Sequence, residues 1–248
     1  MLLQDRLIAV TGGANGIGAA VVRRCAELGA RGVVLDLATS LSGDLPEGWH
    51  EVALDVRDEA SVNVALNDAR RLLGGLDGVV AAAGVVPSWQ PAADLDLDDF
   101  DRVLSINARG VVATVKHAAP LLGPGATITV VASLNSWRGD PNIISYAASK
   151  HAALGIVRSA ALALGPAGVR VNAVAPGPIA TDALRGRMAS RAAHTGLDVD
   201  AALQAAAAGT ALRRIATAGE VADAIVFLTS GLSSGITGQL LNVDGGIL

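Results

Sequence analysis

The stretch TGGANGIG at residues 11–18 is the most informative guide to the fold of this chain. It follows a short apolar run, RLIAV at residues 6–10, which predicts a buried strand, and it opens a helical pattern over residues 16–29. Glycines at such a junction allow a tight turn and leave N–H groups exposed at the start of the helix. The stretch therefore predicts a strand–helix unit that holds a pyrophosphate, and the residues expected to meet it are Gly12, Asn15, Gly16, Ile17 and Gly18.

The spacing of these glycines is G-x-x-x-G-x-G, which differs from the more common dinucleotide-binding pattern G-x-G-x-x-G. Taken alone, the stretch is also compatible with an ordinary glycine-rich turn in front of a helix. Its place in the first strand–helix unit favours dinucleotide binding, because the N-terminus of that helix then faces the phosphates.

Apolar runs and helical patterns alternate along the rest of the chain. The remaining predicted strands lie at residues 33–36, 50–55, 78–84, 126–133, 169–177 and 239–243. Helical patterns lie at residues 58–73, 97–122, 144–165 and 218–230, and residues 97–122 accommodate either one helix or two. Such alternation predicts right-handed crossovers. The expected fold class is α/β: a single-domain, Rossmann-type, doubly wound parallel sheet of about seven strands with helices on both faces.

Residues 178–214 interrupt this alternation, because they are rich in Ala and Arg and contain no strand-like run. A long insertion after the C-terminal end of a strand often covers an active site. We therefore expect one domain over residues 1–248, with a substrate lid at about residues 178–214. The arginines of this region meet either an anionic part of a substrate or simply the solvent, and they are Arg185, Arg187, Arg191, Arg213 and Arg214.

The composition argues against several classes of protein. The chain of 248 residues is 51% hydrophobic but only 2% aromatic, so small aliphatic side chains must fill its core. The net charge of −4 gives no basic surface for nucleic acid. Cys25 is the only cysteine, which fits a reducing compartment. Neither a secretory signal nor an uninterrupted apolar run of membrane-spanning length is present, so we expect a cytoplasmic protein without a membrane span.

A carboxylate at the end of the second predicted strand bears on the choice of dinucleotide. Asp36 is placed to accept hydrogen bonds from both hydroxyls of an adenosine ribose, and it would repel a 2′-phosphate. The glycine-rich stretch contains no Arg or Lys that could attract such a phosphate, and Asn15 occupies the candidate position. These residues favour NAD(H) over NADP(H), although a solvent-exposed Asp at a strand end remains the alternative.

The only tyrosine of the chain, Tyr146, stands four residues before Lys150 in the stretch SYAASK at residues 145–150. On a helix this spacing places both side chains on one face. A free phenol has a pKa near ~10, and a neighbouring ammonium group lowers it by stabilising the phenolate. Tyr146 can then take a proton from a hydroxyl or give one to a carbonyl. The alternative is a half-buried tyrosine beside a solvated lysine.

Seven motifs fall in order along the chain, and together they resemble the short-chain dehydrogenase/reductase family over essentially residues 5–246. The resemblance implies an NAD-dependent oxidoreductase that moves hydride between a secondary alcohol or ketone and the cofactor, with Tyr146 as the acid/base. It further implies a small-molecule substrate, no metal and a homotetramer or dimer. The motifs are TGGANGIG, Asp55-Val56, Ala83-Gly84, Asn107, Ser133, Tyr146-x-x-x-Lys150 and Pro176-Gly177.

The same resemblance implies roles for residues outside the glycine-rich stretch. Ser133 would hold the substrate oxygen, with Ser136 as a rival, and Asn107 would anchor a water that connects Lys150 to solvent. Without the resemblance, Ser133 reads as a helix-capping or strand-end serine, and Asn107 reads as a polar helix residue that faces water. The other implied cofactor contacts are Asp55 and Val56 at the adenine, Ala83 and Gly84 after the fourth strand, and Pro176, Gly177, Ile179 and Thr181 near the nicotinamide.

One motif departs from the family. Where the family often has Asn-Asn-Ala-Gly, this chain has the sequence AAAG at residues 81–84, which puts part of the local hydrogen bonding in doubt. Trp89, Trp137 and Arg138 lie near the same edge of the predicted sheet and either line a substrate pocket or pack locally.

Two other functions remain open. One is a 3-oxoacyl thioester reductase that uses NADPH, which the same family includes; Asp36 and Asn15 argue against it. The other is a dinucleotide-sensing binder without catalytic activity, against which the retention of Ser133, Tyr146 and Lys150 argues.

Overall fold

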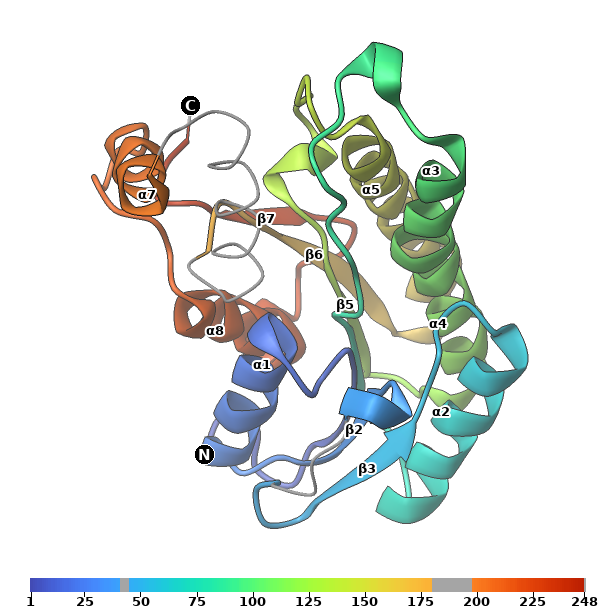
Figure 1. Ribbon diagram of the computed structural model, residues 1–248. Helices are drawn as coiled ribbons and strands as arrows, with labels where there is room; N and C mark the ends of the chain where they lie inside the picture. Colours follow the sequence, from blue (N-terminus) through green and yellow to red (C-terminus); the bar gives the residue numbers. More distant parts are fainter. Residues whose placement is uncertain (41–44, 180–197, 248) are drawn as a thin grey trace.

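The computed structural model describes residues 1–40, 45–179 and 198–247. Within them a single sheet has the strand order β3-β2-β1-β4-β5-β6-β7, and every neighbouring pair is parallel (Figure 1). This architecture confirms the predicted fold class. The strands are β1 (Leu7–Thr11), β2 (Arg31–Asp36), β3 (Trp49–Ala53), β4 (Gly78–Ala81), β5 (Thr127–Val131), β6 (Arg170–Pro176) and β7 (Leu240–Val243).

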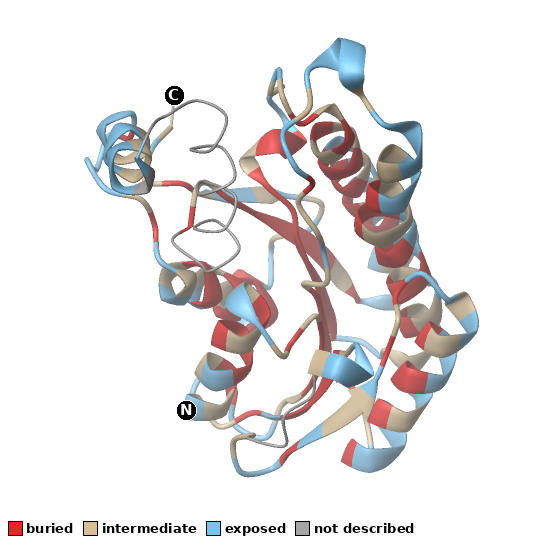
Figure 2. Ribbon diagram, in the orientation of Figure 1, coloured by how far each residue is buried: buried red, intermediate tan, exposed pale blue. Residues whose placement is uncertain are grey.

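Helices cover both faces of the sheet. Figure 1 shows α1 and α8 together on one face and α2, α4 and α5 on the other. The strands alternate between two cores, so that Ile8 and Val10 of β1 pack under α1 and α8 while Ala9 packs on the opposite side. Both cores are fully buried, as Figure 2 shows for the central strands, which explains why the strands are continuous apolar runs. The helices are α1 (Gly16–Glu27), α2 (Glu59–Leu73), α3 (Leu97–Leu104), α4 (Gly110–Ala118), α5 (Ile144–Leu164), α7 (Val199–Ala208) and α8 (Ala218–Thr229).

The segment predicted as one helix or two, residues 97–122, forms two. A π-helical turn at Ser105–Arg109 joins α3 to α4 and brings Asn107 into the interior, where none of its surface is exposed. Such single π-turns widen a helix by one residue and occur often at functional sites.

β4 and β5 are among the strands that are shorter than the sequence predicts, and both end where the chain turns toward one edge of the sheet. β4 ends at Ala81 and β5 at Val131, so residues 82–84 and 132–133 lie beyond the sheet. The order of the strands reverses between β1 and β4, because β2 and β3 extend the sheet on one side and β4 to β7 on the other. Ligands of doubly wound sheets bind at the C-terminal strand ends beside such a reversal.

The predicted lid region is described only in part. Ile179 forms an isolated parallel bridge with Ala216, and α7 occupies Val199–Ala208. Thr181, Arg185, Arg187 and Arg191 lie outside the described residues. Across the helices that are described, none combines the length and the apolar character that crossing a membrane requires.

Candidate functional site

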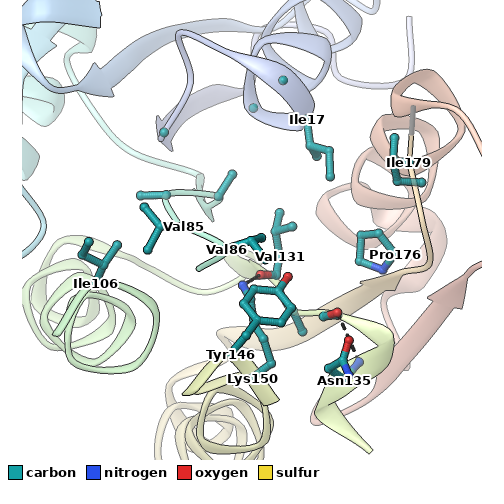
Figure 3. Close-up of a pocket in the computed structure, with 18 of the residues that line it drawn as sticks. Ile17, Val85, Val86, Ile106, Val131, Asn135, Tyr146, Lys150, Pro176 and Ile179 are labelled. Carbon is teal, nitrogen blue, oxygen red and sulfur yellow. Dashed lines mark hydrogen bonds between the residues drawn. The ribbon is translucent and has the colours of Figure 1, made fainter. Parts of the chain in front are cut away.

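A cavity of about 810 Å³ opens at the C-terminal ends of strands β1 to β6 (Figure 3). Its lining includes sixteen of the eighteen predicted site residues. Asn107 lies behind the lining, and Thr181 is outside the described residues. The predicted residues on the lining are Gly12, Asn15, Gly16, Ile17, Gly18, Asp36, Asp55, Val56, Ala83, Gly84, Ser133, Tyr146, Lys150, Pro176, Gly177 and Ile179.

The glycines between β1 and α1 form one wall of the cavity. Gly12 has a φ of +68°, and a Cβ there would lie 2.6 Å from the backbone of Ala83. Gly18 packs directly on the carbonyl of Gly12, which a Cβ would approach to 1.9 Å. A Cβ on Gly16, by contrast, would have no described heavy atom within 4 Å. The turn is therefore closely packed at Gly12 and Gly18 and open at Gly16. The N–H groups that begin α1 are accessible to an anionic ligand.

The segment that departs from the family pattern is held from two sides. The backbone N–H groups of Ala82 and Ala83 donate to the carbonyl and the hydroxyl oxygen of Thr11, at 3.0 and 3.4 Å. Further along, the Asn107 amide accepts from the Val85 N–H and donates to the Val85 carbonyl, both at 2.8 Å. Thr11 and Asn107 thus hold this segment between β1 and the turn that joins α3 to α4, although it lacks the amide side chains of the family pattern.

At one end of the cavity lie three charged side chains. Asp36 accepts the backbone N–H groups of Ala14 and Leu37, at 2.9 and 2.8 Å, which fixes its carboxylate at the end of β2. Asp55 binds the guanidinium of Arg57, with its closest contact at 2.6 Å. The hydrogen bond from Arg57 is the main cause that lowers the pKa of Asp55. Since one acid is neutralised by Arg57, Asp36 leaves this end of the cavity negative.

Ser133 follows β5 and caps a short 3₁₀ turn, Leu134–Ser136. Its Oγ accepts the backbone N–H of Asn135 at 3.1 Å, while its own N–H donates to Ser136 Oγ at 3.2 Å. Because that oxygen already accepts, its proton remains to be donated, and no described residue takes it. Ser136 is 2% exposed and is not on the lining, so of the two rival serines Ser133 is the one that reaches the cavity.

Tyr146 and Lys150 lie on one face of α5, as their spacing predicts. The Nζ of Lys150 is 5.6 Å from the centroid of the Tyr146 ring (Figure 3). It donates one hydrogen bond, at 2.8 Å, to the carbonyl of Val131. Burial lowers the pKa of Lys150 to about 8. The lysine is therefore not solvated, which excludes the alternative interpretation of this pair.

Asn107 connects these elements from behind. Its amide donates to Ser149 Oγ at 3.1 Å, and that hydroxyl donates to the carbonyl of Tyr146 at 2.8 Å. A continuous chain of hydrogen bonds therefore runs from the backbone of Val85 to the first turn of α5. Asn107 does not face water, and its side chain fixes the segment after β4 relative to Tyr146.

The rest of the lining is mostly apolar, and sequence reasoning missed most of it. Trp89 is on the lining, as one alternative predicted, whereas Trp137 and Arg138 are absent from the described lining residues. Many of the missed residues flank the motifs, which is the signal that could have identified them. Arg57 follows Asp55-Val56, Val85 and Val86 follow Gly84, and Leu134 and Asn135 follow Ser133, whereas Ile106, Val131 and Ile143 precede Asn107, Ser133 and Tyr146. Among the described residues, no group of three or more His, Cys, Asp or Glu side chains is arranged so that it could hold a metal ion.

Proteins of known sequence or structure resemble this chain over nearly its whole length. A protein-family model described as enoyl-(acyl carrier protein) reductase, of the short-chain dehydrogenase type, matches residues 12–248. The (−)-isopiperitenol/(−)-carveol dehydrogenase of Mentha piperita is 38% identical, over 99% of this chain and 94% of that protein. The cis-4-hydroxycyclohexanecarboxylate dehydrogenase of Sinomonas cyclohexanicum is also 38% identical, over 98% and 96%. The crystal structure of levodione reductase superposes with a TM-score of 0.88 at 28% identity, over 98% and 97%.

Proposed function

Because this chain belongs to the short-chain dehydrogenase/reductase family, we propose that it is an NAD(H)-dependent oxidoreductase of secondary alcohols and ketones. The single observation that carries this proposal is that Ser133, which follows β5, lies on the lining of the same cavity as Tyr146 and Lys150 of α5. A protein that only sensed a dinucleotide would have no need of these three polar groups.

The cavity fits a nicotinamide dinucleotide. The open space in front of Gly16 and the N-terminus of α1 suit a pyrophosphate, and Asp36 suits the hydroxyls of an adenosine ribose. Asp55 and Val56 would lie at the adenine, and Pro176, Gly177, Ile179 and Thr181 near the nicotinamide. When bound, the cofactor supplies or accepts the hydride, and the protein supplies binding, orientation and electrostatics.

The side chains of the chain itself handle the proton. In the direction of reduction, the hydroxyls of Ser133 and Tyr146 donate hydrogen bonds to the substrate oxygen, and Tyr146 delivers its proton as negative charge develops there. In the direction of oxidation, Tyr146 takes the proton from the alcohol. A protonated Lys150, 5.6 Å from the ring, stabilises the phenolate form of Tyr146 in both directions. A water beside Asn107 would connect Lys150 to solvent.

The preference for NAD(H) rests on the charge at the end of β2. Asp36 is fixed by two backbone N–H groups, and the neighbouring Arg57 is bound to Asp55. A 2′-phosphate at this position would be repelled by the Asp36 carboxylate, and the neighbouring guanidinium of Arg57 would already be bound to Asp55. Repulsion of this kind disfavours the wrong ligand by several kcal/mol at most.

The substrate that suits this cavity has an apolar body. Aliphatic side chains dominate the lining near Ser133 and Tyr146, and Arg102, the other arginine on it, is bound to Asp99 at 2.6 Å. Arg213 and Arg214 bind the carbonyl of Ala208 and the carboxylate of Glu220, so neither supports recognition of an anionic substrate. The relatives named for carveol and for 4-hydroxycyclohexanecarboxylate act on alcohols, and by extension we propose a ring-bearing secondary alcohol or ketone.

A panel of ketones, with NADH and NADPH in turn, tests the proposal through loss of cofactor absorbance. We expect steady consumption of NADH with cyclohexanone derivatives and slower consumption of NADPH. An acetoacetyl thioester belongs in the panel, because the matching family model is described for acyl carrier substrates. Faster turnover of the thioester with NADPH would favour the thioester reductase, and tight NADH binding without turnover of any ketone would favour a sensor.

A further inference from the structure

One polar side chain on the cavity lining has no part in the chemistry proposed above. Asn135 follows Ser133 by two residues and is only 7% exposed, yet it lies on the cavity lining (Figure 3). Its backbone N–H donates to Ser133 Oγ, but its side-chain amide makes no hydrogen bond with any described residue. The amide is not among the buried side-chain atoms that lack a partner, so it is accessible from the cavity and can hydrogen-bond a ligand or water there.

The other buried asparagines show how unusual this is. Asn107 makes three side-chain hydrogen bonds, to the backbone of Val85 and to Ser149. Asn172 donates to the carbonyl of Ile236 and accepts the N–H of Gln239. Both are satisfied within the fold, and neither lies on the cavity lining. Asn135 is the buried asparagine that does lie there, and its amide is the one left available to a ligand.

The position of Asn135 is fixed. In the turn that contains Asn135, the side chain of Ser133 accepts a backbone N–H group, and the backbone N–H of Ser133 donates to the hydroxyl of Ser136. Ser136 itself is buried behind the cavity. The same hydroxyl that we assign to the substrate oxygen, Ser133 Oγ, holds the backbone of Asn135 at 3.1 Å. A group bound by the amide of Asn135 is therefore close to the reacting carbon. In a pocket that is otherwise apolar, a small number of precisely placed polar groups fixes the orientation of the ligand.

We propose that Asn135 is a specificity-determining residue that hydrogen-bonds a second oxygen of the substrate, carried close to the carbon that is oxidised or reduced. The proposal rests on the oxidoreductase function proposed above and narrows its substrate class. An amide both donates and accepts, so the second oxygen belongs to a hydroxyl or a carbonyl group. The substrate is then a vicinal diol, a hydroxyketone or a diketone on an apolar body.

Two ketones of equal size test the proposal: 2-hydroxycyclohexanone and 2-methylcyclohexanone. The wild-type protein should show a higher kcat/KM for the hydroxyketone, and in Asn135→Leu, a substitution of similar volume, the ratio of the two kcat/KM values should fall at least tenfold. Comparing the ratio between proteins cancels the intrinsic reactivity of the ketones. Asn67→Leu, on the exposed side of α2, is the control and should leave the ratio unchanged.

A second variant keeps the test decisive if Asn135→Leu does not fold. Asn135→Asp retains the size and the acceptor but loses the donor, so turnover of cyclohexane-1,2-dione should fall more than that of 2-hydroxycyclohexanone. An unchanged ratio of hydroxyketone to methylketone in folded Asn135→Leu, or equal losses with the dione and the hydroxyketone in Asn135→Asp, would overturn the role of Asn135 while the oxidoreductase function stands. Absence of turnover of every ketone by the wild-type protein would instead overturn the proposed function, and the role of Asn135 with it.

Discussion

The two ends of the cavity use opposite kinds of polar group. At the end formed by β2 and β3, the charged side chains are partly exposed, and Asp55 is paired with Arg57 whereas Asp36 binds only backbone N–H groups. At the end formed by β5 and α5, Ser133 and Lys150 are 6% and 5% exposed, and their hydrogen-bonding capacity is incompletely used by the described residues. With the function proposed above, the first arrangement would select a ligand by charge at little cost. The second would keep desolvated groups in fixed positions for chemistry, at the expense of stability.

The largest effect should come from removing the proton donor at the buried end. Tyr146→Phe keeps the ring and deletes only the hydroxyl, so we expect kcat to fall by about a thousandfold or more. Binding of NADH, measured by its fluorescence, should stay within about threefold, because the cavity keeps its shape. Full activity in this variant would show that the proton reaches the substrate by another route.

Burial of Lys150 should make stability depend on pH in a defined direction. Its pKa is lowered from the ordinary value of 10.5 to about 8, so between these values the unfolded chain binds more protons than the folded one. The free energy of unfolding should therefore rise with pH through this window, by about 3 kcal/mol in total.

Urea unfolding between pH 7 and pH 10.5 measures this effect as a difference between the wild-type protein and Lys150→Met. The difference removes the contribution of Cys25, whose pKa burial raises to about 12 and whose ionisation in the unfolded chain lowers stability as pH rises past 9. Lys116→Met is the matched control, since Lys116 lies exposed beside Glu59. If the two lysine variants show the same pH profile, Lys150 is not desolvated in solution.

A smaller effect is expected from the charge at the exposed end. In Asp36→Ala the repulsion of a 2′-phosphate and the acceptor for the ribose hydroxyls are both lost. The ratio of kcat/KM with NADH to that with NADPH should fall by about 10- to 100-fold. Asp101→Ala removes an equal charge from the exposed surface of α3 and should leave the ratio unchanged. If the ratio of the two kcat/KM values is unchanged in Asp36→Ala, residues other than Asp36 select the cofactor.

The sequence predicted the fold and the motifs because both are local. Strand–helix alternation follows from the apolar period, and Tyr146 and Lys150 share a face because four residues make about one helical turn. Contacts between segments that are far apart in the sequence could not be predicted from it. Nothing in the sequence tells that Asn107 bonds Val85, that Thr11 supports the Ala-rich segment after β4, or that Asn172 is satisfied while Asn135 is not. Those facts depend on how elements pack, which also explains why β4 and β5 end earlier than their apolar runs.

The smallest effect should follow from breaking the ion pair at the exposed end. Arg57 is 53% exposed in its side chain, and water screens its contact with Asp55. In Arg57→Ala we expect the NADH dissociation constant to change by no more than about threefold and the melting temperature by about 2 °C or less. Arg102→Ala, which removes the other paired arginine of the lining, is the matched comparison. A tenfold loss of NADH affinity confined to Arg57→Ala would mean that the guanidinium contacts the cofactor itself, and the exposed end would then bind by a direct contact as well as by charge.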